Sequence, residues 1–152
     1  MHHLAEVLQA EELFREELEK RSPACVCCGR SVHGHQHEET LSSSEDFAEF
    51  LKERGRLEEA EELYRQVLES RRVKLGDEHA DTMSSISDLA TLLKEKEEWK
   101  EAEQLFCDKL KRCQSVHGTQ HKETITATKK LAKFLKERGR QGEAEELLSS
   151  LS

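Results

Sequence analysis

The heptapeptide Phe-Leu-Lys-Glu-Arg-Gly-Arg occurs twice in this chain of 152 residues, at residues 50–56 and at residues 134–140, which are 84 positions apart. Halfway between the two copies, residues 92–98 read Leu-Leu-Lys-Glu-Lys-Glu-Glu, a diverged form of the same segment. The sequence therefore repeats with a period of 42 residues. A fixed period between about 20 and 50 residues is typical of proteins built from stacked structural repeats.

Other residues recur at the same interval of 42 positions, once in each repeat. They are Gly34, Gly76 and Gly118; His37, His79 and His121; Thr40, Thr82 and Thr124; Ala48, Ala90 and Ala132; and Ala60, Ala102 and Ala144. Glycine interrupts every period, so a continuous coiled coil is disfavoured despite the high content of charged residues. The histidines lie before each expected repeat, where a role in capping the turn is favoured over catalysis.

Each period contains two segments in which apolar residues recur at steps of three and four, the spacing of amphipathic helices. These segments predict helices near residues 4–20, 41–54, 57–74, 83–96, 99–115, 125–138 and 142–150. Thr40, Thr82 and Thr124 are the expected N-caps of the first helix of each pair. One pair cannot bury its own apolar faces, so we expect an all-α fold, a right-handed α-solenoid of antiparallel helix pairs.

The turn between the two helices of a pair differs in the second repeat. Glu97 stands there in place of glycine. If the turn needs a left-handed residue, this substitution costs roughly 1 kcal/mol. Trp99, in the same turn, is expected to compensate by burying more area than Leu57 does.

Three regions are predicted along the chain. Residues 10–19 match residues 60–69 at seven of ten positions, so residues 1–21 are interpreted as the second helix of a pair without its first. This leading segment is either a cap or half of a repeat in a longer array, and the array is slightly favoured. Residues 22–39 form a Cys/His-rich loop, and residues 40–152 hold three repeats with approximate bounds 40–81, 82–123 and 124–152.

The overall composition limits which classes of protein this chain can belong to. The formal net charge of −8 argues against nonspecific binding to nucleic acid or membranes. The first six residues contain neither the basic nor the apolar region of a secretory signal. Five cysteines, an odd and unevenly spread set, suit a reducing compartment, so a cytoplasmic location is expected.

The segments Leu-Gly-Asp-Glu-His-Ala-Asp-Thr (75–82), Asp-Leu-Ala-Thr-Leu-Leu (88–93) and Glu-Ala-Glu-Gln-Leu-Phe (101–106) resemble the 42-residue tetratricopeptide repeat of the kinesin light chain type. The resemblance covers residues 34–152. It implies a solenoid whose first helices line a concave groove for peptide segments of partner proteins. The chain departs from the family at the asparagine that hydrogen-bonds ligand backbone, which is replaced by Asp46, Asp88 and Lys130.

Residues beside the buried stripe of each first helix are the expected groove residues. They are Glu45, Asp46 and Glu49 in the first repeat, Ser87, Asp88 and Thr91 in the second, and Lys129, Lys130 and Lys133 in the third. Their charges run from acidic to basic, which suggests a protein or peptide ligand with a charged segment. Ordinary solvated helix faces are the competing interpretation.

The sequence contains no nucleophile–base–orienter set and no glycine-rich phosphate loop, so no catalytic residue, no cofactor and no enzyme activity is expected. Cys25, Cys27 and Cys28 precede His33, His35 and His37, but this spacing is too tight for a zinc finger, and a loop with reduced thiols is favoured. Cys107 and Cys113 are six residues apart on one helix and are expected to face different ways.

The primary prediction is a non-catalytic scaffold that binds a peptide segment in the concave groove. Two alternatives remain: a self-association module that forms a homo-oligomer through the unpaired N-terminal helix, and a metal- or redox-responsive adaptor that uses the cysteine loop.

Overall fold

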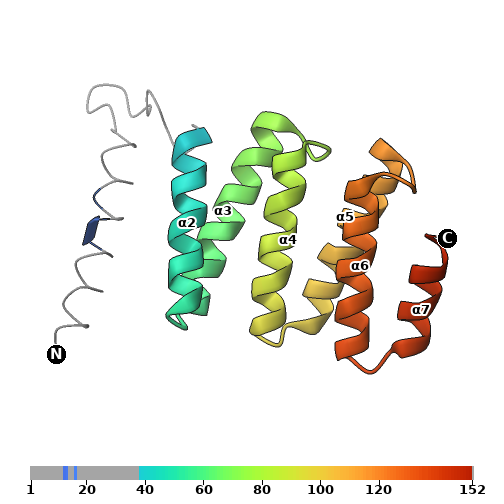
Figure 1. Ribbon diagram of the computed structural model, residues 1–152. Helices are drawn as coiled ribbons and strands as arrows, with labels where there is room; N and C mark the ends of the chain where they lie inside the picture. The colour runs from blue at the N-terminus through green and yellow to red at the C-terminus, as the bar shows by residue number, and fades with distance from the viewer. Residues whose placement is uncertain (1–11, 14–15, 17–37, 152) are drawn as a thin grey trace. The chain divides into compact units, whose positions relative to one another are not determined.

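The computed structural model describes residues 12–13, 16 and 38–151, and residues 38–151 form six helices (Figure 1). The helices are α2 (Glu38–Glu53), α3 (Leu57–Leu75), α4 (Ala80–Glu95), α5 (Trp99–His117), α6 (Lys122–Glu137) and α7 (Gln141–Ser149). All six predicted helices in this part of the chain are confirmed. The predicted leading helix at 4–20 and nearly all of the Cys/His-rich loop at 22–39 lie outside the described residues.

The chain divides into two units, and the first, which ends at Lys74, contains α2 and α3. The short connection after Glu53 reverses the chain, and a hydrogen bond from Arg56 N to Leu51 O (3.0 Å) closes it. Arg71, in the last third of α3, pairs with Glu45, in the middle of α2. The two helices of this pair are therefore antiparallel, as predicted.

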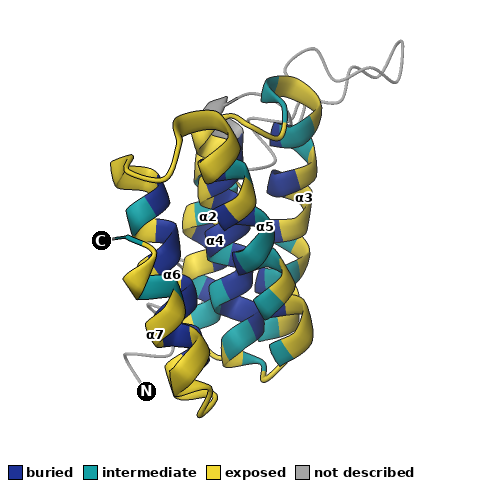
Figure 2. Ribbon diagram, turned by 90° about the vertical axis from the view of Figure 1, so that its right-hand side faces the viewer, coloured by how far each residue is buried: buried dark blue, intermediate teal, exposed yellow. Residues whose placement is uncertain are grey.

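The second unit, from Leu75 onward, contains α4 to α7, in which each helix packs against the next. Ala90 and Ala102 are fully buried, as is Ala144, while Ala132 is 2% exposed. Small side chains at these positions let the helices of a pair approach closely, as the repeat pattern indicated. Figure 2 shows buried residues along one side of each helix and exposed residues along the other, which is the amphipathic pattern predicted from the sequence.

The turns within the helix pairs require a left-handed residue. Gly55 and Gly139 have φ of 78° and 75°, and Glu97 adopts φ of 63° at the equivalent position. Glu97 therefore adopts the left-handed conformation that this turn was expected to need, which is unfavourable for a residue with a side chain. Trp99 is only half-buried, but its ring lies 6.2 Å from that of Phe134 and carries the Arg138 guanidinium 4.6 Å above it.

The N-caps of α4 and α6 are not the threonines. His79 and His121 occupy the cap positions, and their Nδ1 atoms accept hydrogen bonds from Asp81 N (3.3 Å) and Glu123 N (3.2 Å). The prediction for Thr82 and Thr124 was wrong because both helices begin before these residues, which place their side chains in the core instead. The expected capping role of the histidines is confirmed at these two turns.

No helix among the described residues is both long enough and apolar enough to span a membrane.

Candidate functional site

A cavity of about 180 Å³ lies between α4 and α6 in the second unit and is called the α4–α6 groove. Residues of three helices line it: Thr91, Lys94, Phe106, Lys130, Lys133, Phe134 and Glu137. Lys94 Nζ lies 3.1 Å from Glu137 Oε2, and this contact ties the end of α4 to the end of α6. The groove is thus formed by the first helices of two successive repeats, with α5 behind them.

The floor of the groove is aromatic. The rings of Phe106 and Phe134 have centroids 5.5 Å apart and planes tilted by 47°. Both side chains are buried, so their packing fixes the shape of the floor. Tilted aromatic pairs of this kind are favourable beyond the area that they bury.

The rim of the groove is basic. Lys130 and Lys133 are exposed, and no carboxylate among the described residues lies within ion-pair distance of either ammonium group. Lys94 is the rim lysine whose charge is matched, by Glu137. The groove therefore offers two cations without counter-charges above an apolar surface.

A third cation lies beneath the rim. Lys109 on α5 is 7% exposed, and its ammonium donates a hydrogen bond to Ser87 Oγ at 2.5 Å. Burial lowers the pKa of Lys109, and the nearby charge of Lys130 lowers this pKa further. The charges of Glu123 and Asp88 act in the opposite direction, so the main cause of the lowered pKa is burial of the ammonium group.

Of the predicted groove residues in the second unit, the structure brings Thr91, Lys130 and Lys133 together in one groove. Asp88 is half-buried and does not line it. Ser87 departs from the expectation: its side chain is 1% exposed, and its hydroxyl accepts a hydrogen bond from Lys109 and donates one to Met83 O (3.4 Å).

Lys129 lies on another side of α6, where it lines a depression with Ala132, Lys133, Lys136 and Leu148.

The acidic residues predicted for the first repeat belong to the first unit. Glu45 is half-buried and pairs with Arg71, so its charge is matched within the repeat. Glu49 is exposed and pairs with Lys52 at 3.0 Å, and Asp46 is exposed. The acidic half of the predicted charge series therefore contains one carboxylate with a structural partner and two at the surface.

Four lining residues were missed from the sequence: Lys94, Phe106, Phe134 and Glu137. Helical spacing carried a signal for three of them, because Lys94, Phe134 and Glu137 lie three or four positions after Thr91, Lys130 and Lys133. These positions follow the predicted site residues by one helical turn on the same helices. The floor residue Phe106 belongs to α5, and helical spacing on the first helices alone could not identify it.

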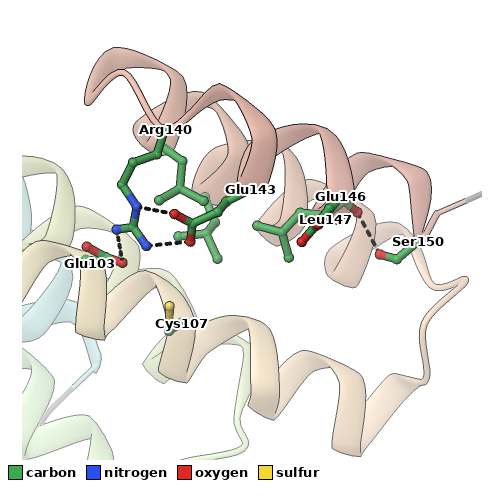
Figure 3. Close-up of a pocket in the computed structure, with 9 residues that line it drawn as sticks. Glu103, Cys107, Arg140, Glu143, Glu146, Leu147 and Ser150 are labelled. Carbon is green, nitrogen blue, oxygen red and sulfur yellow. Dashed lines mark hydrogen bonds and ion pairs between the residues drawn. The ribbon is translucent and has the colours of Figure 1, made fainter.

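A second cavity of about 370 Å³ lies on the α7 side of α5 (Figure 3). Arg140 spans its entrance, donating to Glu103 (2.6 Å) and to both carboxylate oxygens of Glu143 (2.6 and 2.5 Å). Cys107 lies on the wall, and burial, followed by the charge of Glu103, raises the pKa of its thiol. A raised pKa leaves little thiolate at neutral pH, so the arrangement does not activate Cys107 as a nucleophile.

The two cysteines of α5 face different ways, as predicted. Cys113 is buried with its Sγ 3.5 Å from Met83 Sδ, whereas Cys107 is half-exposed. Within the part of the chain that the structure describes, no group of three or more His, Cys, Asp or Glu residues could hold a metal ion. The cysteines at 25, 27 and 28 and the histidines at 33, 35 and 37 lie outside that part.

Comparison with known proteins agrees with this architecture. Residues 39–108 match the family described as tetratricopeptide repeat. No curated protein sequence matches the chain. A crystal structure from Podosopora anserina, of a protein described as a kinesin light chain with nearly identical TPR-like repeats, aligns with a TM-score of 0.78 at 23% identity, over 97% of this chain and 66% of that one.

A second solved structure, BtubC (BKLC) from P. vanneervenii, aligns with a TM-score of 0.71 at 18% identity, over 99% of this chain. This chain spans 57% of BtubC and 66% of the Podosopora anserina protein, so it corresponds to part of each. The resemblance is confirmed to this extent: residues 39–108 match the tetratricopeptide repeat family, and the chain has the all-α solenoid fold of antiparallel helix pairs found in these solved structures.

Proposed function

We propose that the chain is a non-catalytic scaffold that binds an acidic segment of a partner protein in the α4–α6 groove. The tetratricopeptide fold is typical of protein-interaction scaffolds. The observation that carries the finer proposal is the pair of exposed lysines, Lys130 and Lys133, without counter-charges above the floor formed by Phe106 and Phe134.

The groove suits two kinds of side chain at once. Its cavity of about 180 Å³ has room for about one apolar side chain, which would pack on the phenylalanine floor. Carboxylates on either side of that apolar residue would then reach the rim lysines. Opposite charges across such a surface favour the correct orientation and accelerate encounter more than they raise affinity.

The buried Lys109 strengthens the preference for an anion. Its ammonium has a hydroxyl partner in Ser87, and no carboxylate among the described residues lies within ion-pair distance of it. A carboxylate bound near Lys130 would reduce the repulsion between the two ammonium groups. The ligand would thus gain from a charge below the rim as well as from the rim itself.

A random peptide library displayed on phage tests the proposal. We expect the selected peptides to be rich in Asp and Glu around one bulky apolar residue. Fluorescence anisotropy of a selected peptide should then show about a tenfold higher Kd, equivalent to about 1.4 kcal/mol, for Lys130→Glu than for the unchanged chain. Raising the salt concentration should weaken binding to the unchanged chain, because exposed charges are screened.

Lys136→Glu is the matched control. It makes the same charge change on the same helix, and Lys136 does not line the groove. Selection of peptides without acidic residues, or an equal loss of affinity in the two variants, would show that the α4–α6 groove is not the binding site.

A further inference from the structure

One end of the α4–α6 groove contains an ion pair between the two helices that form it. Lys94 Nζ on α4 lies 3.1 Å from Glu137 Oε2 on α6, and both residues line the groove. The Lys94 side chain is 27% exposed and the Glu137 side chain is 40% exposed. An exposed ion pair contributes little to stability, because water solvates both charges when they separate. This contact can therefore open at little cost.

The first repeat shows that the lysine at this position does not require a partner from another repeat. Lys52, the counterpart of Lys94, pairs with Glu49 on its own helix at 3.0 Å. Thr91 stands in the second repeat where Glu49 stands in the first, so α4 offers Lys94 no carboxylate three positions earlier. The carboxylate of Glu137 comes instead from α6. The chain thus places one of its own anions on a cation of the groove.

The other two rim cations lie on the same helix as Glu137. Lys130 and Lys133 precede Glu137 by seven and four positions. Seven residues of an α-helix rise by about 10 Å, and an extended peptide covers this length in about three residues. A segment with one carboxylate at Lys130 therefore brings a second carboxylate, about three positions along, to the end of the groove where Glu137 lies.

We propose that Lys94 is a binding site for a second carboxylate of the ligand, and that Glu137 occupies this site when no ligand is bound. This inference rests on the proposed function of the α4–α6 groove and adds a residue that recognises the ligand. On binding, the ligand carboxylate replaces that of Glu137 at Lys94, and the Glu137 side chain turns into solvent. The ligand gains only the difference between two ion pairs, so Glu137 lowers the affinity for segments with two suitably spaced acidic residues.

NMR titration of the full chain tests the proposal with a synthetic peptide whose core reads Glu-Leu-Ser-Glu. Glu137→Gln should bind this peptide about threefold more tightly than the unchanged chain does, because Lys94 then has no anion to release. Adding Lys94→Gln to Glu137→Gln should remove the gain. For peptides in which either glutamate is replaced by glutamine, Glu137→Gln should change the Kd less than about twofold, because a single carboxylate pairs with the unoccupied rim lysines.

Glu95→Gln is the matched control. Glu95 is the second-repeat counterpart of Glu137, is exposed at the end of α4, and has no cation among the described residues within ion-pair distance. This variant should leave the Kd of the doubly acidic peptide unchanged, and the spectra show directly that each variant is folded.

Two results overturn the proposal. Glu137→Gln gives no gain in affinity, or the gain persists when Lys94 is also replaced, which would make it a general effect of removing a negative charge. Lys130→Gln judges the proposed function separately. If Lys130→Gln weakens binding while Glu137→Gln has no effect, the peptide site stands and the second carboxylate site alone fails. If no peptide shifts the resonances of the groove residues, both proposals fail.

Discussion

At the residue scale, the backbone of Glu97 in the turn of the second repeat adopts an unfavourable conformation. Glu97 has φ of 63°, whereas Gly55 and Gly139 fill the equivalent positions in the other repeats. A side chain in this region costs about 1–2 kcal/mol, part of which glycine gives back through its larger entropy when unfolded. We therefore expect Glu97→Gly to raise the free energy of unfolding by about 0.5–1 kcal/mol, measured by urea denaturation.

The reciprocal change is the control for the glycine prediction. Gly139→Ala meets no atom within 4 Å of the added Cβ, so any loss of stability comes from backbone conformation alone. We expect it to lower the free energy of unfolding by about 1 kcal/mol. A Glu97→Gly variant that is less stable than the parent would contradict the strain argument.

Lys109 is the second residue at which a single substitution is informative. Its charge is buried, and none of the carboxylates in the described part of the chain lies within ion-pair distance, so Lys109→Met should raise the free energy of unfolding at neutral pH by about 1 kcal/mol. Ser87 keeps a partner in this variant, because its hydroxyl also donates to Met83 O. Lys111→Met, on the exposed side of α5, should have little effect.

The pH dependence gives the Lys109 prediction a second readout. The folded-state pKa of Lys109 lies below its ordinary value of 10.5, so the unfolded chain binds the proton more tightly. The penalty of the buried charge is fully present below the folded-state pKa and disappears as pH rises from that value towards 10.5. The advantage of Lys109→Met should therefore shrink over this interval. A constant advantage would mean that the lysine does not titrate differently in the folded chain.

The caps show where residue-level prediction failed and why. Threonine is a better N-cap than histidine by intrinsic preference, and Thr82 and Thr124 recur with the period. Yet His79 and His121 supply the acceptor three residues earlier, and Thr124 donates to Cys113 O (3.1 Å) and Gly118 O (2.7 Å) in the core. The repeat identified the correct turn, but propensity alone could not choose between two recurring polar residues within it.

At the element scale, helix positions were predictable because apolar spacing and the period agreed. The six described helices begin within three residues of the expected positions, and the largest differences are at α2, α4 and α6, each of which begins before the threonine expected to cap it. The attachment of α7 was not predictable. One of its contacts comes from Arg140, just before the helix, which joins Glu143 of α7 to Glu103 on α5, 37 positions away in the sequence.

Arg140→Gln should loosen α7. The variant loses both charge-assisted contacts, so we expect faster amide hydrogen exchange in α7 at neutral pH, with α4 unchanged. Lys111→Gln is the control for the loss of one exposed positive charge. Equal exchange in the parent and in Arg140→Gln would show that apolar packing alone holds α7.

Acid should remove the same contact. Hydrogen bonds from Arg140 hold the pKa of Glu143 below its ordinary value. The contact is fully present above the ordinary pKa of glutamate, about 4.3, and is lost as pH falls through the lowered folded-state value. The difference in Tm between the parent chain and Arg140→Gln should therefore be constant near neutrality and approach zero in acid. A difference that grows as pH falls would contradict the assignment.

At the scale of the whole molecule, the predicted charge series is divided between the two units, with the acidic residues in the first unit and the lysines in the second. Residues at 45 and 87 were expected at the surface because helical spacing placed them beside the buried stripe. Each instead meets a basic side chain from the second helix of its own repeat: Glu45 meets Arg71, and Ser87 meets Lys109. Such contacts depend on side chains 22–26 positions away, which a single-helix pattern does not reveal.

The third repeat divides its lysines between two surfaces. Lys130 lines the α4–α6 groove, Lys129 and Lys136 line the depression between α6 and α7, and Lys133 lines both. The proposed peptide site therefore uses two of these four lysines, so the same change of charge can be made inside and outside the groove on one helix.

We expect Lys130→Gln and Lys133→Gln each to weaken binding of the acidic peptide by a few-fold, because each removes one exposed cation from the rim of the α4–α6 groove. Lys136→Gln removes the same charge from the same helix outside the groove, so the affinity for the peptide should stay close to that of the unchanged chain. Fluorescence anisotropy with one labelled peptide measures all three variants. An equal loss in the three would mean that the peptide responds to the net charge of α6, and no loss in Lys130→Gln or Lys133→Gln would mean that it binds elsewhere.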